Sequence, residues 1–144
     1  MQKSIPSVAV LIIKGKKVLL VESGEESNHE TGIFGLPSGI VEKGESEDEA
    51  AVRELAEETG LITNLDDLVE FSGNFYIASI KRKDGSKKTF AWRVFLCKNY
   101  SGGLRTTKES IPKWVHIEKM DNFYLLPNIK NATISALKFL ENET

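Results

Sequence analysis

Short apolar runs alternate with helical segments along this chain, and this alternation restricts the folds that it can adopt. Five segments are strand-like: residues 8–13, 18–21, 71–80, 90–97 and 114–117. Lys14-Gly15-Lys16 predicts a tight connection between the first two, and Asp84-Gly85 marks a hairpin turn between the third and the fourth. Because strands and helices interleave, we expect an α/β fold in which helices cover a mixed sheet.

The helix signals agree best over residues 46–59. Ser46 and Glu49 form a capping-box pair, acidic residues occupy the first turn, and Gly60 follows the last turn. Beyond Pro127, apolar residues recur at helical spacing, which predicts a closing amphipathic helix packed on the sheet. Two polar, glycine-containing stretches are predicted to be exposed loops: residues 23–32 and 100–112.

The composition excludes several classes of protein. The chain has 144 residues, a usual length for one domain, so we expect a single domain over residues 1–144. Its 19 basic and 21 acidic side chains give a net charge of −2, which is too balanced for bulk attraction to nucleic acid or to a membrane surface. The first apolar run is too short for a signal peptide or a membrane span. Cys97 is the one cysteine, which fits a reducing, cytoplasmic location.

Three glutamates share one face of the first predicted helix. Glu54, Glu57 and Glu58 stand at i, i+3 and i+4, and the last two lie where the helix dipole disfavours carboxylates by up to about 1 kcal/mol each. On a helical wheel Arg53 points to the opposite side, where Glu49 is its expected partner, so it cannot neutralise the cluster. A hard divalent cation fits better, and we infer a magnesium site that handles phosphate. The alternative is a solvated acidic helix end.

The turn that precedes this helix can contribute to the same site. Gly39 and Gly44 bound the turn, and glycine allows the backbone to approach closely where a side chain would not. A loop carbonyl from the turn could therefore reach the cation. Glu45 either adds a ligand or holds Arg53 in place, and the sequence leaves both roles open.

The turn and the helix together form one spaced motif. Its positions are Gly39, Glu45, Arg53-Glu54-Leu55, Glu57-Glu58 and Gly60-Leu61. This motif resembles, position for position, the signature of the MutT-like Nudix hydrolases. The resemblance implies an α/β/α sandwich with a mixed β-sheet between helices. It also implies dependence on Mg²⁺ or Mn²⁺ and hydrolysis of a nucleoside diphosphate linked to another group.

The resemblance further implies roles for individual residues. Glu54, Glu57 and Glu58 would act as metal ligands, or one of them as the base. Ser38 stands where many relatives carry a second glycine before Gly39, and its backbone carbonyl would still bind the metal. We therefore expect Ser38 and Gly39 beside the cofactor.

Other residues are expected to take part in the reaction. Arg53 and Glu45 belong to the motif and count among the expected catalytic residues. Relatives place the proton acceptor differently, so it stays open between Glu54, Glu58 and Glu109, the last of which lies in the loop of residues 100–112.

Selectivity for the substrate would come from residues outside the motif. Asn128 resembles the purine-reading asparagine of MutT-like nucleotide-pool sanitisers, with an ordinary helix N-cap as the alternative. Phe75, Tyr76 and Trp92 lie on strands where one face could stack a base, although alternation directs at least half of such side chains to the core. His29 could enter a pocket from its long loop. Basic residues flank the hairpin turn and could contact phosphates or form a solvated tip: Lys81, Arg82, Lys83, Lys87 and Lys88.

These observations predict a pyrophosphohydrolase that uses Mg²⁺ and a small-molecule nucleotide. The expected reaction converts a nucleoside triphosphate, with oxidised purine nucleotides among the candidates, to a monophosphate and pyrophosphate. The alternatives are hydrolysis of a dinucleoside polyphosphate, a nucleotide sugar or ADP-ribose, and a non-catalytic Nudix-fold nucleotide sensor. No membrane and no bulk nucleic acid is expected as a partner, and a homodimer stays open.

Overall fold

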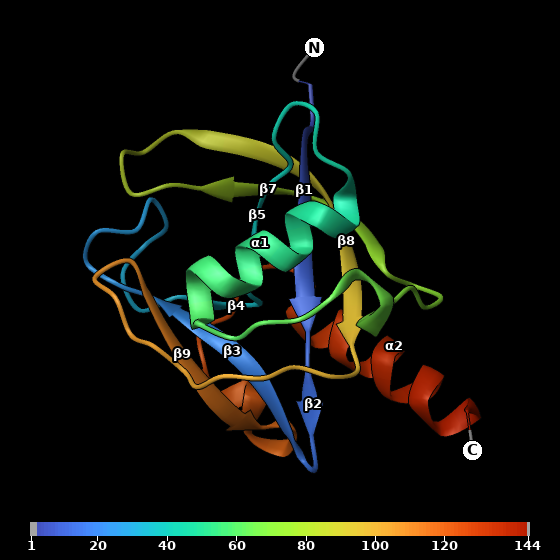
Figure 1. Ribbon diagram of the computed structural model, residues 1–144. Coiled ribbons are helices and arrows are strands. Elements are labelled where there is room, and N and C mark those ends of the chain that lie inside the picture. The colour runs from blue at the N-terminus through green and yellow to red at the C-terminus, as the bar shows by residue number, and fades with distance from the viewer. Residues whose placement is uncertain (1–2, 144) are drawn as a thin grey trace.

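The structure, a computed structural model, describes residues 3–143 (Figure 1). In chain order its elements are β1 (Ile5–Leu11), β2 (Ile13–Lys14), β3 (Lys17–Ser23), β4 (Phe34–Gly35), β5 (Ser38–Ile40), α1 (Glu47–Thr59), the 3₁₀ helix η1 (Leu65–Asp67), β6 (Leu68–Val69), β7 (Phe75–Lys81), β8 (Lys87–Cys97), β9 (Ser110–His116), the 3₁₀ helix η2 (Ile117–Asn122) and α2 (Ile129–Asn142). Strands and helices interleave as expected. Within residues 3–143, no helix combines the length and the apolar character that crossing a membrane requires.

The strands form two sheets. In the first, β1 lies between β5 and β8, antiparallel to β5 and parallel to β8, while β6 and β7 pair antiparallel with β8. In the second, β3 pairs antiparallel with β2, β4 and β9. The mixed sheet that the sequence predicts is thus confirmed. An antiparallel sheet accompanies it, and the chain enters this second sheet at β2, directly after β1.

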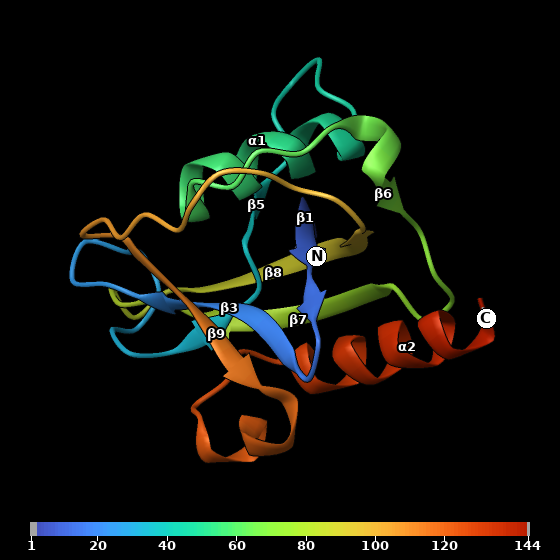
Figure 2. The ribbon, with the colours of Figure 1, turned by 60° about the horizontal axis from the view of Figure 1, so that its bottom comes forward.

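The two long helices cover opposite faces of the sheets. Val8 and Val10 of β1 pack in one core cluster with Leu55 of α1. Leu11, from the other face of β1, packs in a second cluster with Ala132 of α2. Successive strand residues point to opposite faces, so one strand serves both layers. Figure 2 shows α1 above and α2 below the strands, which confirms the α/β/α sandwich.

The helix α1 begins and ends where its sequence predicts. The hydroxyl of Ser46 accepts from the backbone N–H of Glu49, and the carboxylate of Glu49 accepts from the backbone N–H of Ser46. At the other end, Gly60 adopts the left-handed conformation with φ 87° and donates its N–H to the carbonyl of Ala56. Both caps depend on neighbours within one turn, which is why the sequence predicts them well.

All five expected strands differ somewhat in their bounds, and for two of them the physical reason is clear. β7 begins later, at Phe75, because Gly73 turns the chain with φ 84° just before it. β9 begins earlier, at Ser110, although it contains Pro112. β9 pairs with β3 alone, so it is an edge strand, where a missing N–H on the open side is tolerated.

The loop over residues 23–32 is exposed in part, as its composition predicts, for example at Glu25 and Glu26, but it also packs against neighbouring segments. Gly24 is buried and donates its N–H to the carbonyl of Glu109 at 2.9 Å. On another side, the backbone N–H of Lys83 donates to the carbonyl of Asn28 at 3.0 Å. The loop therefore packs between the segment before β9 and the β7–β8 hairpin (Figure 1).

Candidate active site

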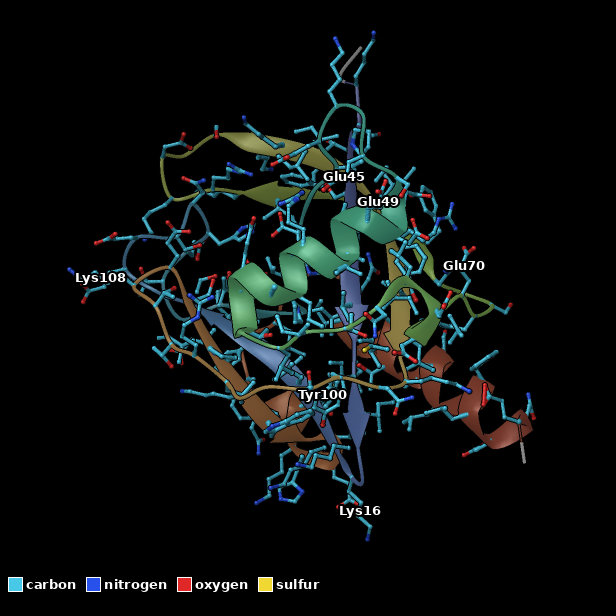
Figure 3. All side chains as sticks on the ribbon, viewed as in Figure 1. Lys16, Glu45, Glu49, Glu70, Tyr100 and Lys108 are labelled. Atoms are coloured by element: carbon cyan, nitrogen blue, oxygen red, sulfur yellow. The ribbon has the colours of Figure 1, made fainter. Side chains whose placement is uncertain are left out.

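Arg53 of α1 is held by oxygen acceptors from its own helix and from the turn before it. Its Nε and Nη2 donate to the two carboxylate oxygens of Glu45 at 2.7 and 2.9 Å. Its Nη1 donates to Glu54 at 2.7 Å, and Nη2 also donates to the carbonyl of Ile40 at 3.0 Å. The hydrogen bonds from Arg53 lower the pKa of Glu45 to about 2. Figure 3 shows Glu45 beside the start of α1, so the guanidinium joins the turn to the helix.

The geometry corrects one expectation about Arg53 and shows one of the two roles considered for Glu45. Glu49 is not the partner of Arg53, because its carboxylate belongs to the capping box with Ser46. Nor does the guanidinium point away from the acidic face, since it also lies 3.3 Å from the carboxylate of Glu57. A helical wheel gives the direction of a Cβ atom alone, and the long arginine side chain turns back. Of the two roles left open for Glu45, its contacts show that of holding Arg53.

Gly39 lies against the carboxylate of Glu54. A Cβ atom at position 39 would collide with that carboxylate. Gly39 cannot retreat, because it is paired opposite Val8 in the ladder between β5 and β1. The side chain of Glu54 is 12% exposed, and this burial raises its pKa although Arg53 acts in the opposite direction. Glycine therefore permits this close approach, and any side chain at position 39 would force the carboxylate of Glu54 to move.

Glu58 reaches the same turn from the last turn of α1. The backbone N–H of Ser38 donates to Glu58 Oε1 at 2.7 Å. Burial raises the pKa of Glu58 to about 8, and the charges on Glu54 and Glu57 act in the same direction. A carboxyl group in this environment keeps its proton near neutral pH unless a positive charge approaches it.

A positive charge caps the end of α1. Arg105, in the loop before β9, donates from Nη2 to the carbonyl of Ala56 at 3.0 Å and to that of Glu57 at 3.2 Å. Its backbone N–H donates to the carbonyl of Thr59 at 2.8 Å. These carbonyls carry the negative end of the helix dipole, so Arg105 stabilises the turn that presents Glu57 and Glu58.

The loop before β9 also brings Glu109 to the site. Glu109 is exposed, and together with Glu58 it lines a small cavity of about 20 Å³. Ser38, Ser110 and His29 form other parts of the same wall. Two carboxylates that are far apart in the sequence therefore face one cavity.

A larger pocket adjoins this cavity. It has a volume of about 100 Å³, and its walls include Gly39, Phe90 and Trp92. The pocket and the cavity share four wall residues: His29, Leu36, Ser38 and Leu126. The carboxylates of α1 thus lie beside an aromatic pocket.

The aromatic candidates from the sequence lie in different places. Trp92 and His29 line the pocket. Tyr76 does not line it, and packs against Trp92 with ring centroids 5.1 Å apart. Phe75 does not line it either, because it lies on the outer face of β7, 46% exposed, with Arg93 4.9 Å from its ring centroid.

Asn128 stands just before α2, between the pocket residues Pro127 and Ile129. It is the one residue other than glycine with a positive φ in residues 3–143, at 68°. Its side chain makes no capping hydrogen bond to α2, so it does not act as the ordinary N-cap that was the alternative.

The Nudix domain family model matches residues 3–138, nearly the whole of the described chain. The chain belongs to the Nudix family. Its motif carboxylates, its sandwich of sheets between two helices and the turn packed on Glu54 all agree with this assignment. Relatives that match this chain are named as a pyrophosphatase and a pyrophosphohydrolase. Together with the family match, they indicate that this protein is a Nudix hydrolase.

Several known proteins resemble this Nudix chain. The ADP-ribose pyrophosphatase of Methanocaldococcus jannaschii is 47% identical over 66 residues, which are 44% of this chain and 38% of that protein. The CTP pyrophosphohydrolase of Escherichia coli strain K12 is 29% identical over 127 residues, which are 87% of this chain and 85% of that protein. The crystal structure of a MutT protein from Methanosarcina mazei Go1 has a TM-score of 0.73 and 28% identity, covering 99% of this chain and 98% of that one.

The first of these matches is partial. This chain spans 38% of the length of the archaeal pyrophosphatase, and 22% and 23% of two Nudix hydrolases from Arabidopsis thaliana. The matching part therefore supports membership of the family. It does not show that this chain acts on the substrates of those longer proteins.

Nudix hydrolases generally use divalent metal ions, and the oxygen atoms around α1 are of the type that binds such an ion. Carboxylate and carbonyl oxygens are the ligands of hard divalent cations. Glu54 and Glu58 are partly buried carboxyl groups with raised pKa values, which a cation would reverse. Within residues 3–143, no three acidic, histidine or cysteine side chains are already arranged as a metal site, and these carboxylates bond to Arg53 and Ser38 instead.

Sequence reasoning missed two parts of this Nudix site. The sequence predicts that a positive charge is needed at the end of α1, but nothing in it identifies Arg105 as the residue that supplies this charge. Phe90 and Leu126 in the pocket had no signal of their own, because their place depends on the register of β8 and on the segment beside β4. There, the N–H of Leu126 donates to the carbonyl of Phe34 at 2.8 Å.

Proposed function

We propose that this Nudix hydrolase uses Mg²⁺ to cleave a nucleoside triphosphate to a nucleoside monophosphate and pyrophosphate. The observation that carries the proposal is that the cavity lined by Glu58 and Glu109 shares four wall residues with the aromatic pocket. A polyphosphate in the cavity then has its base in the pocket. The reaction named for the E. coli relative, which aligns over 87% of this chain, supports the same chemistry.

The metal would be held by Glu54, Glu57, Glu58 and the backbone carbonyl of Ser38. When bound, Mg²⁺ lowers the pKa of a coordinated water and offsets the charge on the phosphate oxygens. Glu57 is 58% exposed and so can reorient toward a cation at small cost. Gly39 keeps the turn close enough to Glu54 for its neighbour's carbonyl to join the ligand set.

The remaining residues position a carboxylate and accept a proton. Glu45 fixes Arg53, and Arg53 orients the carboxylate of Glu54. The attacking water gives its proton to Glu54, Glu58 or Glu109. Single glutamine variants separate these candidates, because loss of the base changes the pH profile of turnover, whereas loss of a ligand raises the Mg²⁺ concentration required.

Hydrolysis of ADP-ribose is a second candidate reaction. It is favoured by the 47% identity to the archaeal ADP-ribose pyrophosphatase over 66 residues. Dinucleoside polyphosphates and nucleotide sugars contain the same phosphoanhydride linkage. The triphosphate is preferred here because the E. coli relative matches over more of its own length, 85% against 38%.

A substrate screen tests the proposal directly. Nucleoside triphosphates, including oxidised purine forms, would be compared with ADP-ribose, a dinucleoside tetraphosphate and a nucleotide sugar in millimolar Mg²⁺. Release of pyrophosphate from a triphosphate supports the proposal, and ¹⁸O-labelled water identifies the phosphorus that is attacked. Nucleotide binding without any turnover would instead indicate the non-catalytic sensor.

Further expectations stand as parts of the same proposal. We propose one Nudix domain over residues 1–144, a cytoplasmic location and a small-molecule nucleotide as the partner. Asn128 is proposed to contact the base, since it lies between two pocket residues and its side chain does not cap α2. Light scattering during size-exclusion chromatography tests for a homodimer.

A further inference from the structure

Three buried polar atoms without a hydrogen-bond partner belong to residues of one pocket. Among residues 3–143, the unpartnered buried side-chain nitrogens are His29 Nδ1, Arg82 Nε and Trp92 Nε1. All three residues line the pocket beside the cavity of Glu58, although they come from a loop, a hairpin and a strand. Buried polar groups in proteins are nearly always paired. Their concentration around one pocket therefore points to a ligand that supplies the missing partners.

The hydrogen-bonding capacity of these atoms restricts the ligand. The indole of Trp92 and the guanidinium of Arg82 are donors and never acceptors. Burial lowers the pKa of His29, and the charge on Arg82 lowers it further. A neutral imidazole offers one donor and one acceptor. The pocket thus presents two fixed donors and one group that can adapt.

The remaining walls are apolar and suit a flat group. Phe90, Leu126 and Pro127 contribute to them. The side chain of Trp92 is 8% exposed, and Arg82 lies over the ring of Phe90 with 5.4 Å from its guanidinium carbon to the ring centroid. These contacts hold both donor side chains in place. A planar ring with acceptors along one edge matches such walls.

We infer that this pocket selects a base by an edge that carries two neighbouring acceptors, so that guanine and cytosine are preferred to adenine. Guanine presents O6 and N7 side by side, and cytosine presents O2 and N3. Adenine has an amino donor next to the acceptor on both of these edges. Arg82 and Trp92 donate to the two acceptors, and His29 pairs with a neighbouring group. The inference rests on the proposed function, because it assumes a nucleotide substrate.

Rates with three triphosphates test the preference. The wild type is expected to have a kcat/KM for GTP or CTP at least about tenfold above that for ATP, the scale of one good base contact. Trp92→Phe keeps an aromatic ring and removes the donor, and Arg82→Met keeps the length and removes the charge. Both should lower the rate with the preferred base by a larger factor than the rate with ATP, so that the ratio of the two rates falls. Lys87→Met is the matched control, because exposed Lys87 is on the same hairpin and outside the pocket.

A binding measurement separates this inference from the proposed function. Calorimetry with GMP, CMP and AMP, on variants whose melting curves show that they fold, reports base preference without turnover. Tighter binding of GMP or CMP than AMP, lost in Trp92→Phe, supports the inference even if no triphosphate is cleaved, a result that would overturn the proposed function. Equal binding and equal rates with all bases overturn the inference alone. Equal losses for every base in both pocket variants overturn it too.

Discussion

Two regions of the site, the surroundings of Arg53 and the aromatic pocket, differ in how their polar atoms are paired. Around Arg53, four carboxylates share one guanidinium at 2.7 to 3.7 Å: Glu42, Glu45, Glu54 and Glu57. In the neighbouring pocket, the described residues leave three buried nitrogens without a partner. One region therefore has an excess of acceptors and the other an excess of donors. A nucleoside polyphosphate with its metal ion would supply what each region lacks.

The two regions also differ in how the chain builds them. The carboxylates and Arg53 lie within residues 39–61, on one turn and one helix. The pocket draws on residues from Ser7 to Ile129 and on several strands. This contrast explains why a local sequence motif predicts the first region, whereas the second region can be recognised in the folded structure alone. The following predictions test whether the two regions act separately, from the largest expected effect to the smallest.

Glu58→Gln should lower turnover at least about 10²-fold, the scale of a group that acts in the reaction. The reason is that a neutral amide can neither ionise to bind an approaching cation nor accept a proton. Steady-state rates at saturating Mg²⁺ measure the effect, and Glu118→Gln, an exposed glutamate on η2, is the control. Unchanged turnover would remove Glu58 from the site.

Addition of Mg²⁺ should stabilise the fold, because an ion that binds the folded state alone raises the free energy of unfolding. At a concentration 100 times the Kd the gain is about 2.7 kcal/mol. Thermal melts with and without millimolar Mg²⁺ measure it. The shift should shrink in Glu57→Gln and persist in Trp92→Phe, which lies in the other region. If Mg²⁺ does not change the melting temperature of the wild type, the carboxylates around Arg53 are not a cation site.

Gly39→Ala should destabilise the protein by about 1–3 kcal/mol, because the new Cβ atom forces the carboxylate of Glu54 aside. Urea unfolding gives this difference in free energy. Gly103→Ala is a matched control, since a Cβ atom there has no neighbour within 4 Å. Equal stability of the two variants would show that the close approach at Gly39 has no energetic consequence.

The stability of the pocket region should depend on pH through His29. Burial and Arg82 hold the pKa of His29 below its unfolded value of about 6.5, so the fold favours the neutral ring. Its contribution is complete above about pH 6.5 and is lost as the pH falls through the folded pKa, with a slope of at most about 1.4 kcal/mol per pH unit. His29→Gln should flatten this slope in urea unfolding, whereas substitution of the exposed His116 should not. Identical slopes in all three proteins would contradict the assignment.

Much of the site could be predicted because its signals are local. The caps of α1 and the spacing of Glu54, Glu57 and Glu58 depend on neighbours within one or two helical turns. The partner of Arg53 could not be predicted in the same way, because the direction of its long side chain is set by Glu45 outside the helix. The start of β9 could not be predicted because proline normally argues against a strand. That Pro112 lies on an edge strand, where proline is tolerated, is known from the sheet pairing alone.

The sequence by itself determined the family motif, the helix that carries the carboxylates and the alternation of strands that makes the sandwich. Each of these follows from residue spacing and from short-range hydrogen bonds. The tertiary structure decided where Arg105 and Glu109 lie and which nitrogens of His29, Arg82 and Trp92 lack partners. Those properties arise where segments far apart in the chain pack together, and no local period in the sequence records such contacts.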